Sequence, residues 1–224
     1  MQAIYLVKNG KTKEAFEFRD IQITEPKDDE VGVIVEASGI NFADVVARLG
    51  QYQDCPPLPT VVGYEAVGRV EKVGKDIKTV QKGDRVLVFT RFGGYSQYVL
   101  QKENAIAKIS EEMDAGKALA LATQYSTAYY ASYVSTNIFP GETVLIHSGA
   151  GGVGTALIQL CKLKGAKIYT TAGSESKLEY CRKQGADVVI NYVKDDFSQV
   201  IKEPIDVAFD AVGAENFRKS YKLL

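Results

Sequence analysis

Residues 144–161 constrain the fold more than any other part of the chain, because a buried strand, a glycine cluster and a helix follow one another there without a gap. The strand is Val-Leu-Ile-His over residues 144–147, and the cluster is Gly-Ala-Gly-Gly-Val-Gly over residues 149–154. Residues 155–161 then carry apolar side chains at helical spacing. This order of elements is typical of the first unit of a dinucleotide-binding fold.

The glycines of this turn have distinct predicted roles in binding a dinucleotide. Gly149 permits the tight turn, Gly151 lets the backbone approach a pyrophosphate, and Gly154 lets the helix pack closely on the sheet. The start of the helix that follows adds free N–H groups and the positive end of the helix dipole, and Gly152 and Val153 of the turn belong to the predicted cofactor set. A purely structural turn is the alternative, because the motif itself is short.

The end of the second strand, about twenty residues further on, is where an acidic side chain would bind the ribose of NAD. No carboxylate ends the strand at residues 166–171, and Gly173, Ser174 and Lys177 follow it. Two unit charges about 4 Å apart interact by about 4 kcal/mol at an effective dielectric constant of about 20, so one side chain can decide the cofactor. We therefore expect NADP(H), whose 2′-phosphate suits Lys177. Glu175 leaves NADH as an alternative, and Lys177 and Glu175 as solvated charges of the next helix as another.

Composition restricts the partners and the compartment. The 224 residues carry a net charge of −1, and no long cluster of lysine and arginine offers a surface for nucleic acid. The apolar runs have the length of strands, which predicts no membrane span and no signal sequence. The three cysteines form no C-x-x-C pair, as expected in a reducing compartment. We expect a soluble, cytoplasmic protein that binds small molecules, with Cys161 and Cys181 in the core and Cys55 in a loop.

The two halves of the chain have different patterns. Up to about residue 111, short β-branched runs separated by glycine predict a mostly antiparallel β domain. Its strands are expected at residues 31–35, 61–73, 85–89 and 95–100, with one helix at residues 42–49. From residue 114 onward, strands alternate with helices, which predicts a parallel sheet. Its strands are expected at residues 143–147, 167–171, 188–191 and 205–210, after a long helix at residues 118–133.

The predicted architecture is therefore α/β, with a β domain at residues 1–120 and a doubly wound domain at residues 121–224. Such a domain needs about six strands, and the sequence ends after the fourth, so we expect it to be incomplete. The four-residue spacing of three tyrosines predicts a shared helix face that packs at a domain interface. These are Tyr125, Tyr129 and Tyr133. The one histidine, His147, is predicted to be a hydrogen-bonded packing residue rather than an acid or base.

Several short motifs, in order along the whole chain, carry a resemblance to a known family. They are Gly-Ile-Asn-Phe-Ala-Asp at residues 39–44, Pro-Leu-Pro at 57–59, Gly-Tyr-Glu-Ala-Val-Gly at 63–68, Gly-Asp-Arg-Val at 83–86, the glycine turn at 149–154, and Asp-Ala-Val-Gly at 210–213. The chain resembles the medium-chain dehydrogenase/reductase superfamily. Within it, the chain is similar to the zinc-free NADPH:quinone oxidoreductases, especially the branch of the vesicle amine transport protein homologues. The resemblance implies a GroES-like β domain followed by a Rossmann domain, in a full-length protein about half as long again.

The resemblance also bears on metal ions and on the reaction. Zinc members carry a cysteine where this chain has Asn41 and a histidine where it has Tyr64, and residues 89–100 lack the cysteines of a structural zinc site. We therefore expect no metal. Without a Lewis acid, oxidation of a simple alcohol is disfavoured, whereas a quinone or an α,β-unsaturated carbonyl can accept hydride with hydrogen-bond donors alone.

The resemblance implies two sets of site residues. Asn41 and Tyr52 are assigned to the substrate and nicotinamide pocket, with Asp44 and Tyr64 beside it; Asn41 would orient the ligand and Tyr52 would donate to the developing oxyanion. A helix cap at Asp44 and a core aromatic at Tyr64 are the alternatives. The cofactor set comprises Thr127 near the nicotinamide amide, Tyr192 with Ser174 and Lys177 near the adenosine phosphate, and Ala211, Val212 and Gly213 at the end of the fourth strand.

Together these features predict a zinc-independent, NADPH-dependent oxidoreductase that transfers hydride to a quinone or enone in a cleft between two domains. A homodimer through the Rossmann domain is expected from the resemblance. A binding or transport-associated protein that keeps the nucleotide fold is the alternative of a different class, and an inactive fragment is a third.

Overall fold

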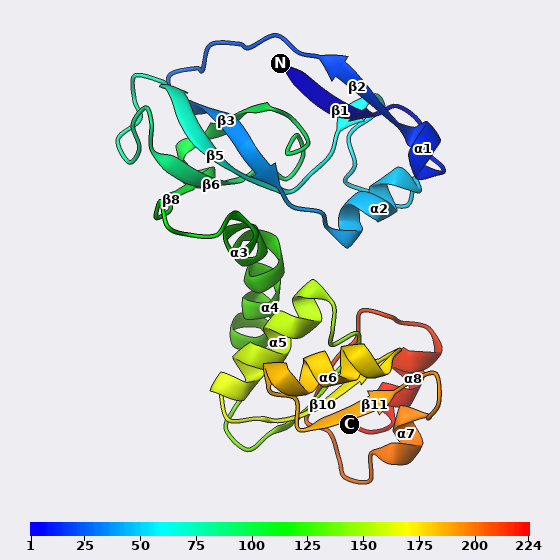
Figure 1. Cartoon of the computed structure of the whole chain (residues 1–224). Coiled ribbons are helices and arrows are strands. Elements are labelled where there is room, and N and C mark those ends of the chain that lie inside the picture. Colours follow the sequence, from blue (N-terminus) through cyan, green and yellow to red (C-terminus); the bar gives the residue numbers. More distant parts are fainter. The chain divides into compact units, whose positions relative to one another are not determined.

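A computed structural model describes all 224 residues as two compact units, Met1–Thr123 and Gln124–Leu224. Each unit has its own sheets and its own apolar core (Figure 1). The domain boundary expected between residues 120 and 121 stays a prediction.

The first unit consists of two antiparallel sheets. The three-stranded sheet has the order β2 (Phe16–Asp20), β1 (Gln2–Leu6), β4 (Thr60–Val61). The five-stranded sheet has the order β7 (Tyr98–Lys102), β3 (Glu30–Ser38), β5 (Glu65–Val73), β6 (Arg85–Phe89), β8 (Ile106–Lys108). The helices are α1 (Thr12–Ala15), α2 (Phe42–Arg48), the 3₁₀ turn η1 (Glu103–Ala105) and α3 (Ala115–Ala120). The predicted antiparallel β domain and its helix after residue 41 are thus confirmed.

Valines at alternate positions build the core of the five-stranded sheet. Val31 and Val33 of β3 pack with Val86 and Val88 of β6, and all four side chains are fully buried. Because side chains alternate between the two faces of a strand, this two-residue spacing directs one face of each strand inward.

The single strand predicted at residues 61–73 is wrong, because the structure divides it into β4 and β5. Gly63 has φ +104 in the intervening turn, a conformation that favours glycine, and its N–H donates to Asp44 Oδ1 at 3.0 Å. Tyr64 therefore lies in a turn and is half-buried, rather than a core aromatic within a strand. The strand expected at residues 95–100 begins only at Tyr98.

The second unit is a four-stranded parallel sheet with helices. Its strand order is β11 (Val188–Asn191), β10 (Lys167–Ala172), β9 (Thr143–Ile146), β12 (Val207–Phe209). Its helices are α4 (Ser126–Tyr129), α5 (Gly152–Leu163), α6 (Glu175–Gln184), α7 (Phe197–Val200) and α8 (Glu215–Tyr221). In chain order this places the third, second, first and fourth strands side by side, as in one part of a doubly wound sheet. The α/β prediction is confirmed, although β12 is shorter than the predicted strand at residues 205–210.

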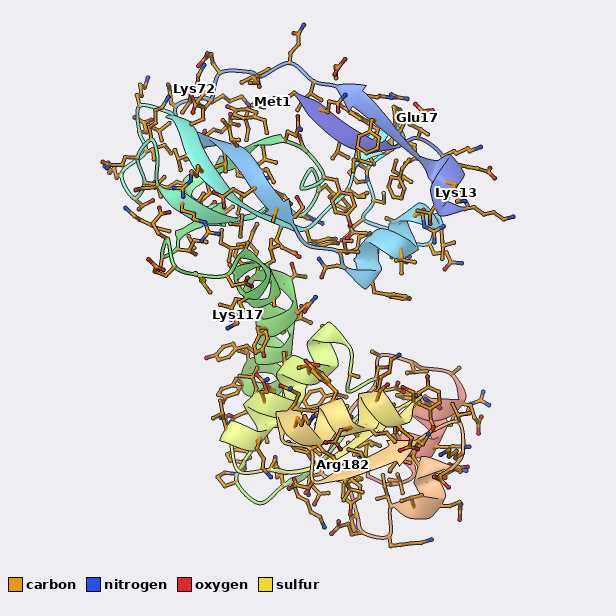
Figure 2. The ribbon with its side chains drawn as sticks, viewed as in Figure 1. Met1, Lys13, Glu17, Lys72, Lys117 and Arg182 are labelled. Atoms are coloured by element: carbon orange, nitrogen blue, oxygen red, sulfur yellow. The ribbon has the colours of Figure 1, made fainter.

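Both faces of this sheet are covered. Val144 and Ile146 of β9 pack with apolar residues of α5 and α6, whereas Leu145 packs on the opposite face with Phe197 of α7. In Figure 1, α5 and α6 lie side by side along the strands, and the exposed side chain of Arg182 on α6 is labelled in Figure 2. The predicted core cysteines, Cys161 and Cys181, are fully buried; Cys55 is half-buried and packs beside Tyr52.

The long helix expected at residues 118–133 differs in its internal structure. Helical residues run from Ala115 to Ser135, but two π-helical segments, η2 (Leu121–Tyr125) and η3 (Tyr130–Ser135), flank α4. Each π-type turn changes the angular spacing of the side chains, so a uniform 3.6-residue period does not apply. Tyr129 and Tyr133 stack at 4.7 Å between ring centroids, whereas Tyr125 packs against the core under α5.

His147 follows β9 and is held from three sides. Its Nδ1 lies 3.0 Å from Thr171 Oγ1, its Nε2 lies 2.9 Å from Ser220 Oγ, and its ring meets Phe197 edge-on. The imidazole is 2% exposed, and burial lowers its pKa below the ordinary value of 6.5. The prediction of a hydrogen-bonded packing residue is confirmed.

This environment predicts a pH-dependent stability. Because the pKa is lower in the folded state, the stabilisation is present above pH 6.5 and is lost as the pH falls through the folded pKa, with a slope of at most about 1.4 kcal/mol per pH unit. Thermal denaturation between pH 7.5 and 5 should show this slope, and His147→Gln should remove it. Since the chain has one histidine, the difference in slope between the two proteins reports on His147, and identical slopes would contradict the assignment.

Candidate functional site

A buried carboxylate in the first unit fixes the orientation of Asn41. Asn41 Nδ2 donates to Glu65 Oε1 at 2.8 Å and to Oε2 at 3.0 Å, and the Thr123 hydroxyl donates to Oε2. The exposed fractions of Asn41 and Glu65 are 8% and 1%. These contacts direct an N–H of the Asn41 amide toward the carboxylate and so fix the orientation of the side chain.

Glu65 has a space made for it by a glycine. A Cβ on Gly39 would lie 1.7 Å from Glu65 Oε1, so no other residue type fits there without displacing the carboxylate. Burial raises the pKa of Glu65, while the hydrogen bonds from Thr123 and Asn41 oppose this rise. From the sequence, Glu65 belongs to a family motif but has no assigned role. The sequence could have pointed to Glu65, because it is a charged residue directly before an apolar run. A charged side chain at the start of a buried strand needs hydrogen-bond partners.

Asp44, in the first turn of α2, accepts three hydrogen bonds. Its Oδ2 accepts from the Asn41 backbone N–H at 2.8 Å and from the Tyr95 hydroxyl at 3.0 Å, and its Oδ1 accepts from Gly63 N–H at 3.0 Å. The Asn41 bond is a helix cap, the alternative weighed for this residue. Asp44 thereby joins the start of α2 to the turn that carries Tyr64.

Tyr52 and Tyr64 form a hydroxyl pair within an aromatic cluster. The Tyr64 hydroxyl donates to the Tyr52 hydroxyl, and Phe92 lies 5.8 Å from the Tyr64 ring and 6.3 Å from the Tyr52 ring. Burial, followed by the contact with Tyr52, raises the pKa of Tyr64 above its ordinary value, so this hydroxyl remains a donor at neutral pH. The hydrogen of Tyr52 is then directed to a further acceptor.

In the second unit, the glycine turn has a closed side and an open side. A Cβ on Gly149 would lie 2.0 Å from Thr170 Oγ1, and one on Gly154 would lie 2.3 Å from the Ser148 carbonyl oxygen. A Cβ on Gly151 would meet only that carbonyl, at 3.2 Å. Gly149 and Gly154 are therefore required for packing, whereas Gly151 leaves space beside the helix start.

The first amides of α5 point out of the helix at this open side. The first intrahelical bond runs from Thr155 N–H to Gly151 O at 2.8 Å, so the amides of Gly152, Val153 and Gly154 precede the hydrogen-bonded ladder. Gly152 packs close to the Gln124 side chain, where a Cβ would lie 2.3 Å away. Thr127 is exposed on α4, which lies beside α5.

The other predicted cofactor residues lie where the parallel strands end. A Cβ on Gly173 would lie 2.6 Å from the Tyr192 hydroxyl, and Ser174 caps α6 through its hydroxyl, which accepts from Lys177 N–H. The structure thus places these four residues together at the ends of β10 and β11. Lys177 and Tyr192 are exposed.

The end of β12 completes this edge of the sheet. Asp210 Oδ1 accepts from Val212 N–H at 2.7 Å and from Gly213 N–H at 2.9 Å, which shapes the turn that includes Ala211. The other oxygen, Oδ2, is buried without a partner in the chain. Ligands of doubly wound folds bind at the carboxyl ends of the strands, and the predicted cofactor residues near β10, β11 and β12 lie there.

Comparison with known proteins identifies the family. The profile of the alcohol dehydrogenase GroES-like domain matches residues 27–111, and the profile of the zinc-binding dehydrogenases matches residues 152–224. Human quinone oxidoreductase is 34% identical over 211 residues, which span 92% of this chain and 64% of that protein. The crystal structure of Escherichia coli quinone oxidoreductase complexed with NADPH aligns with a TM-score of 0.93 at 32% identity, over all of this chain and 70% of that one. The chain belongs to the quinone oxidoreductase branch of the medium-chain dehydrogenase/reductase superfamily.

The expected branch is also found among the relatives. The human synaptic vesicle membrane protein VAT-1 homologue is 34% identical over 96% of this chain and 56% of that protein. The resemblance stated from the motifs, with its GroES-like and Rossmann-type domains, is therefore confirmed. The chain spans less than two thirds of the length of these two human relatives.

Two structural findings bear on metals and membranes. No group of three or more histidine, cysteine, aspartate or glutamate side chains is arranged to hold a metal ion. No helix of the chain combines the length and the apolar character that crossing a membrane requires. The individual site assignments stay predictions.

Two alanine substitutions separate the closed and open sides of the glycine turn. Gly154→Ala should lower the free energy of unfolding by about 1–3 kcal/mol, because the new Cβ overlaps the Ser148 carbonyl. Gly151→Ala should remain within about 1 kcal/mol, because φ −79 suits alanine and the nearest atom is 3.2 Å away. Urea denaturation of both variants tests this; equal losses would contradict the division.

Proposed function

We propose that the protein is an NADPH-dependent oxidoreductase that transfers hydride to a quinone or an α,β-unsaturated carbonyl compound. The observation that carries this proposal is the open face of Gly151 beside the unpaired first amides of α5. A helix of 12 residues presents the positive end of its dipole at that point. Backbone donors and a positive dipole end together suit a pyrophosphate.

Residues of the second unit would hold the cofactor. Gly152, Val153 and Gly154 would donate their amides to the pyrophosphate, while Ser174, Lys177 and Tyr192 would surround a 2′-phosphate. The similarity to the E. coli quinone oxidoreductase, whose crystal structure is a complex with NADPH, supports this choice of dinucleotide. When bound, NADPH supplies the hydride.

Residues of the first unit would position and stabilise the acceptor. Tyr52 would donate its hydrogen to the oxygen on which negative charge develops, and Tyr64 would strengthen this donor by its own hydrogen bond to Tyr52. Asn41 would orient a ligand, and Glu65 would act as a positioning residue that holds the amide. Asp44 accepts three hydrogen bonds from its neighbours, which favours a positioning role over proton transfer.

This arrangement suits conjugated acceptors. In a quinone or an enone, the incoming electron pair is delocalised onto an oxygen, where one well-placed donor contributes about 3 kcal/mol of transition-state stabilisation.

A homodimer through the Rossmann domain and a cytoplasmic location stay predictions. The similarity to a VAT-1 homologue keeps a non-catalytic, transport-associated role as the second candidate; NADPH binding without oxidation across a panel of quinones and enones would favour it.

The cofactor assignment is tested by reversing one charge. Lys177→Glu should raise the Kd of the intact protein for NADPH by at least about 30-fold and change that for NADH by less than about threefold, because only NADPH brings a phosphate to this position. Fluorescence titration with each dinucleotide measures both constants. Lys183→Glu, on the same helix, is the matched control. Equal losses for both dinucleotides would refute the phosphate contact.

The acceptor chemistry is tested by removing one hydroxyl. Tyr52→Phe should lower kcat with a benzoquinone or a simple enone by about 100-fold, while the Kd for NADPH changes by less than about twofold. Tyr180→Phe, an exposed tyrosine on α6, serves as the control. Consumption of NADPH followed by absorbance gives the rates. Full activity in Tyr52→Phe would contradict the role of this hydroxyl.

A further inference from the structure

An ion pair lies directly beside the residues assigned to the 2′-phosphate. Glu175, the first residue of α6, accepts at Oε1 from Lys194 Nζ at 2.9 Å and from Asn191 Nδ2 at 3.4 Å. The pairing lowers the pKa of Glu175 and raises that of Lys194, so both groups are charged at neutral pH. The carboxylate is therefore directed toward the turn that follows β11.

Backbone hydrogen bonds in the turn that follows β11 fix the position of Lys194. Asn191 is 7% exposed, its carbonyl accepts from Lys194 N–H at 3.0 Å, and its Oδ1 accepts from Val193 N–H at 3.1 Å. Tyr192 belongs to the same turn and reaches Gly173 with its hydroxyl. One short turn thus touches the start of α6 at two points.

Glu175 is the one carboxylate among residues 173–177. Left unpaired, its negative charge at the start of α6 would repel a 2′-phosphate bound beside it. Charges at such separations interact appreciably at a protein surface, where the effective dielectric constant is well below that of water. The pairing partner of Glu175 therefore affects which dinucleotide the site prefers.

We propose that Lys194 is a specificity-determining residue: by pairing with Glu175 it offsets the negative charge of that carboxylate beside the 2′-phosphate subsite and favours NADPH over NADH. This inference rests on the proposed function. It assigns to Lys194 an action through Glu175, not a contact with the phosphate. A distinct prediction follows, since removing Glu175 should make Lys194 dispensable.

The experiment is a double-mutant cycle on the intact protein. Lys194→Met should raise the Kd for NADPH by about three- to tenfold and change the Kd for NADH by less than about twofold, with a larger effect at low salt. Glu175→Gln should bind NADPH at least as tightly as the unsubstituted protein. In the Glu175→Gln background, Lys194→Met should change the Kd for NADPH by less than about twofold.

The control variant replaces a lysine that lies on α6 but does not pair with Glu175. Lys183→Met removes one exposed positive charge from the same helix and should leave the ratio of the two constants unchanged. Thermal melting of each variant without dinucleotide verifies that the fold is intact. An unaltered ratio in Lys194→Met overturns the proposal, as does a loss that persists in the double variant, which would indicate direct contact with phosphate. Failure of the unsubstituted protein to bind either dinucleotide would overturn the proposed function, and this inference with it.

Discussion

The close packing of the glycine turn against the Thr170 hydroxyl and the Ser148 carbonyl is the constraint on which the second unit depends. Thr170 donates its hydroxyl to the Ile146 carbonyl at 2.7 Å, across β9 and β10, and Gly149 passes directly over that hydroxyl. Gly154 then brings α5 against the Ser148 carbonyl. With both positions packed, the chain turns sharply enough for the first amides of α5 to lie at the strand ends. The same steric limit that requires these glycines therefore creates the geometry proposed to bind a pyrophosphate.

In the first unit, buried polar groups and their hydrogen bonds organise the candidate site, rather than close steric packing. Removing Glu65 and Asp44 from water is costly, and the hydrogen bonds from Asn41, Thr123, Tyr95 and the Gly63 backbone offset that cost. If a donor turned away, it would leave a buried carboxylate without a hydrogen bond, which is costly. Each hydrogen bond therefore favours one orientation of its donor. Rigidity of the site follows from the penalty for every other arrangement.

Local patterns predicted the elements, and long-range contacts decided what the patterns left open. Strand β11 coincides with its prediction, because a short β-branched run, Val-Val-Ile at residues 188–190, follows a helix and ends at a turn. The prediction of one strand over residues 61–73 missed the turn at Gly63, since the partner of Gly63, Asp44, is 19 residues away. The π-helical segments have no compositional signal. Glu65 and Asn41 are 24 residues apart, and Lys194 and Glu175 are 19 apart, so neither pair is visible in a local window.

The tyrosine hydroxyls of the first unit are protonated, and this determines which of them donates a hydrogen bond to which group. Burial raises the pKa of Tyr64 and of Tyr95, so both stay protonated at neutral pH. Tyr95 donates to Asp44 and Tyr64 donates to Tyr52, which leaves the Tyr52 hydrogen as the donor that the aromatic cluster can offer to a ligand. A hydroxyl that already accepts a hydrogen bond is a stronger donor, because the two bonds polarise one another. Such a group stabilises negative charge on an oxygen without transferring its proton, which is the requirement of hydride addition to a conjugated carbonyl.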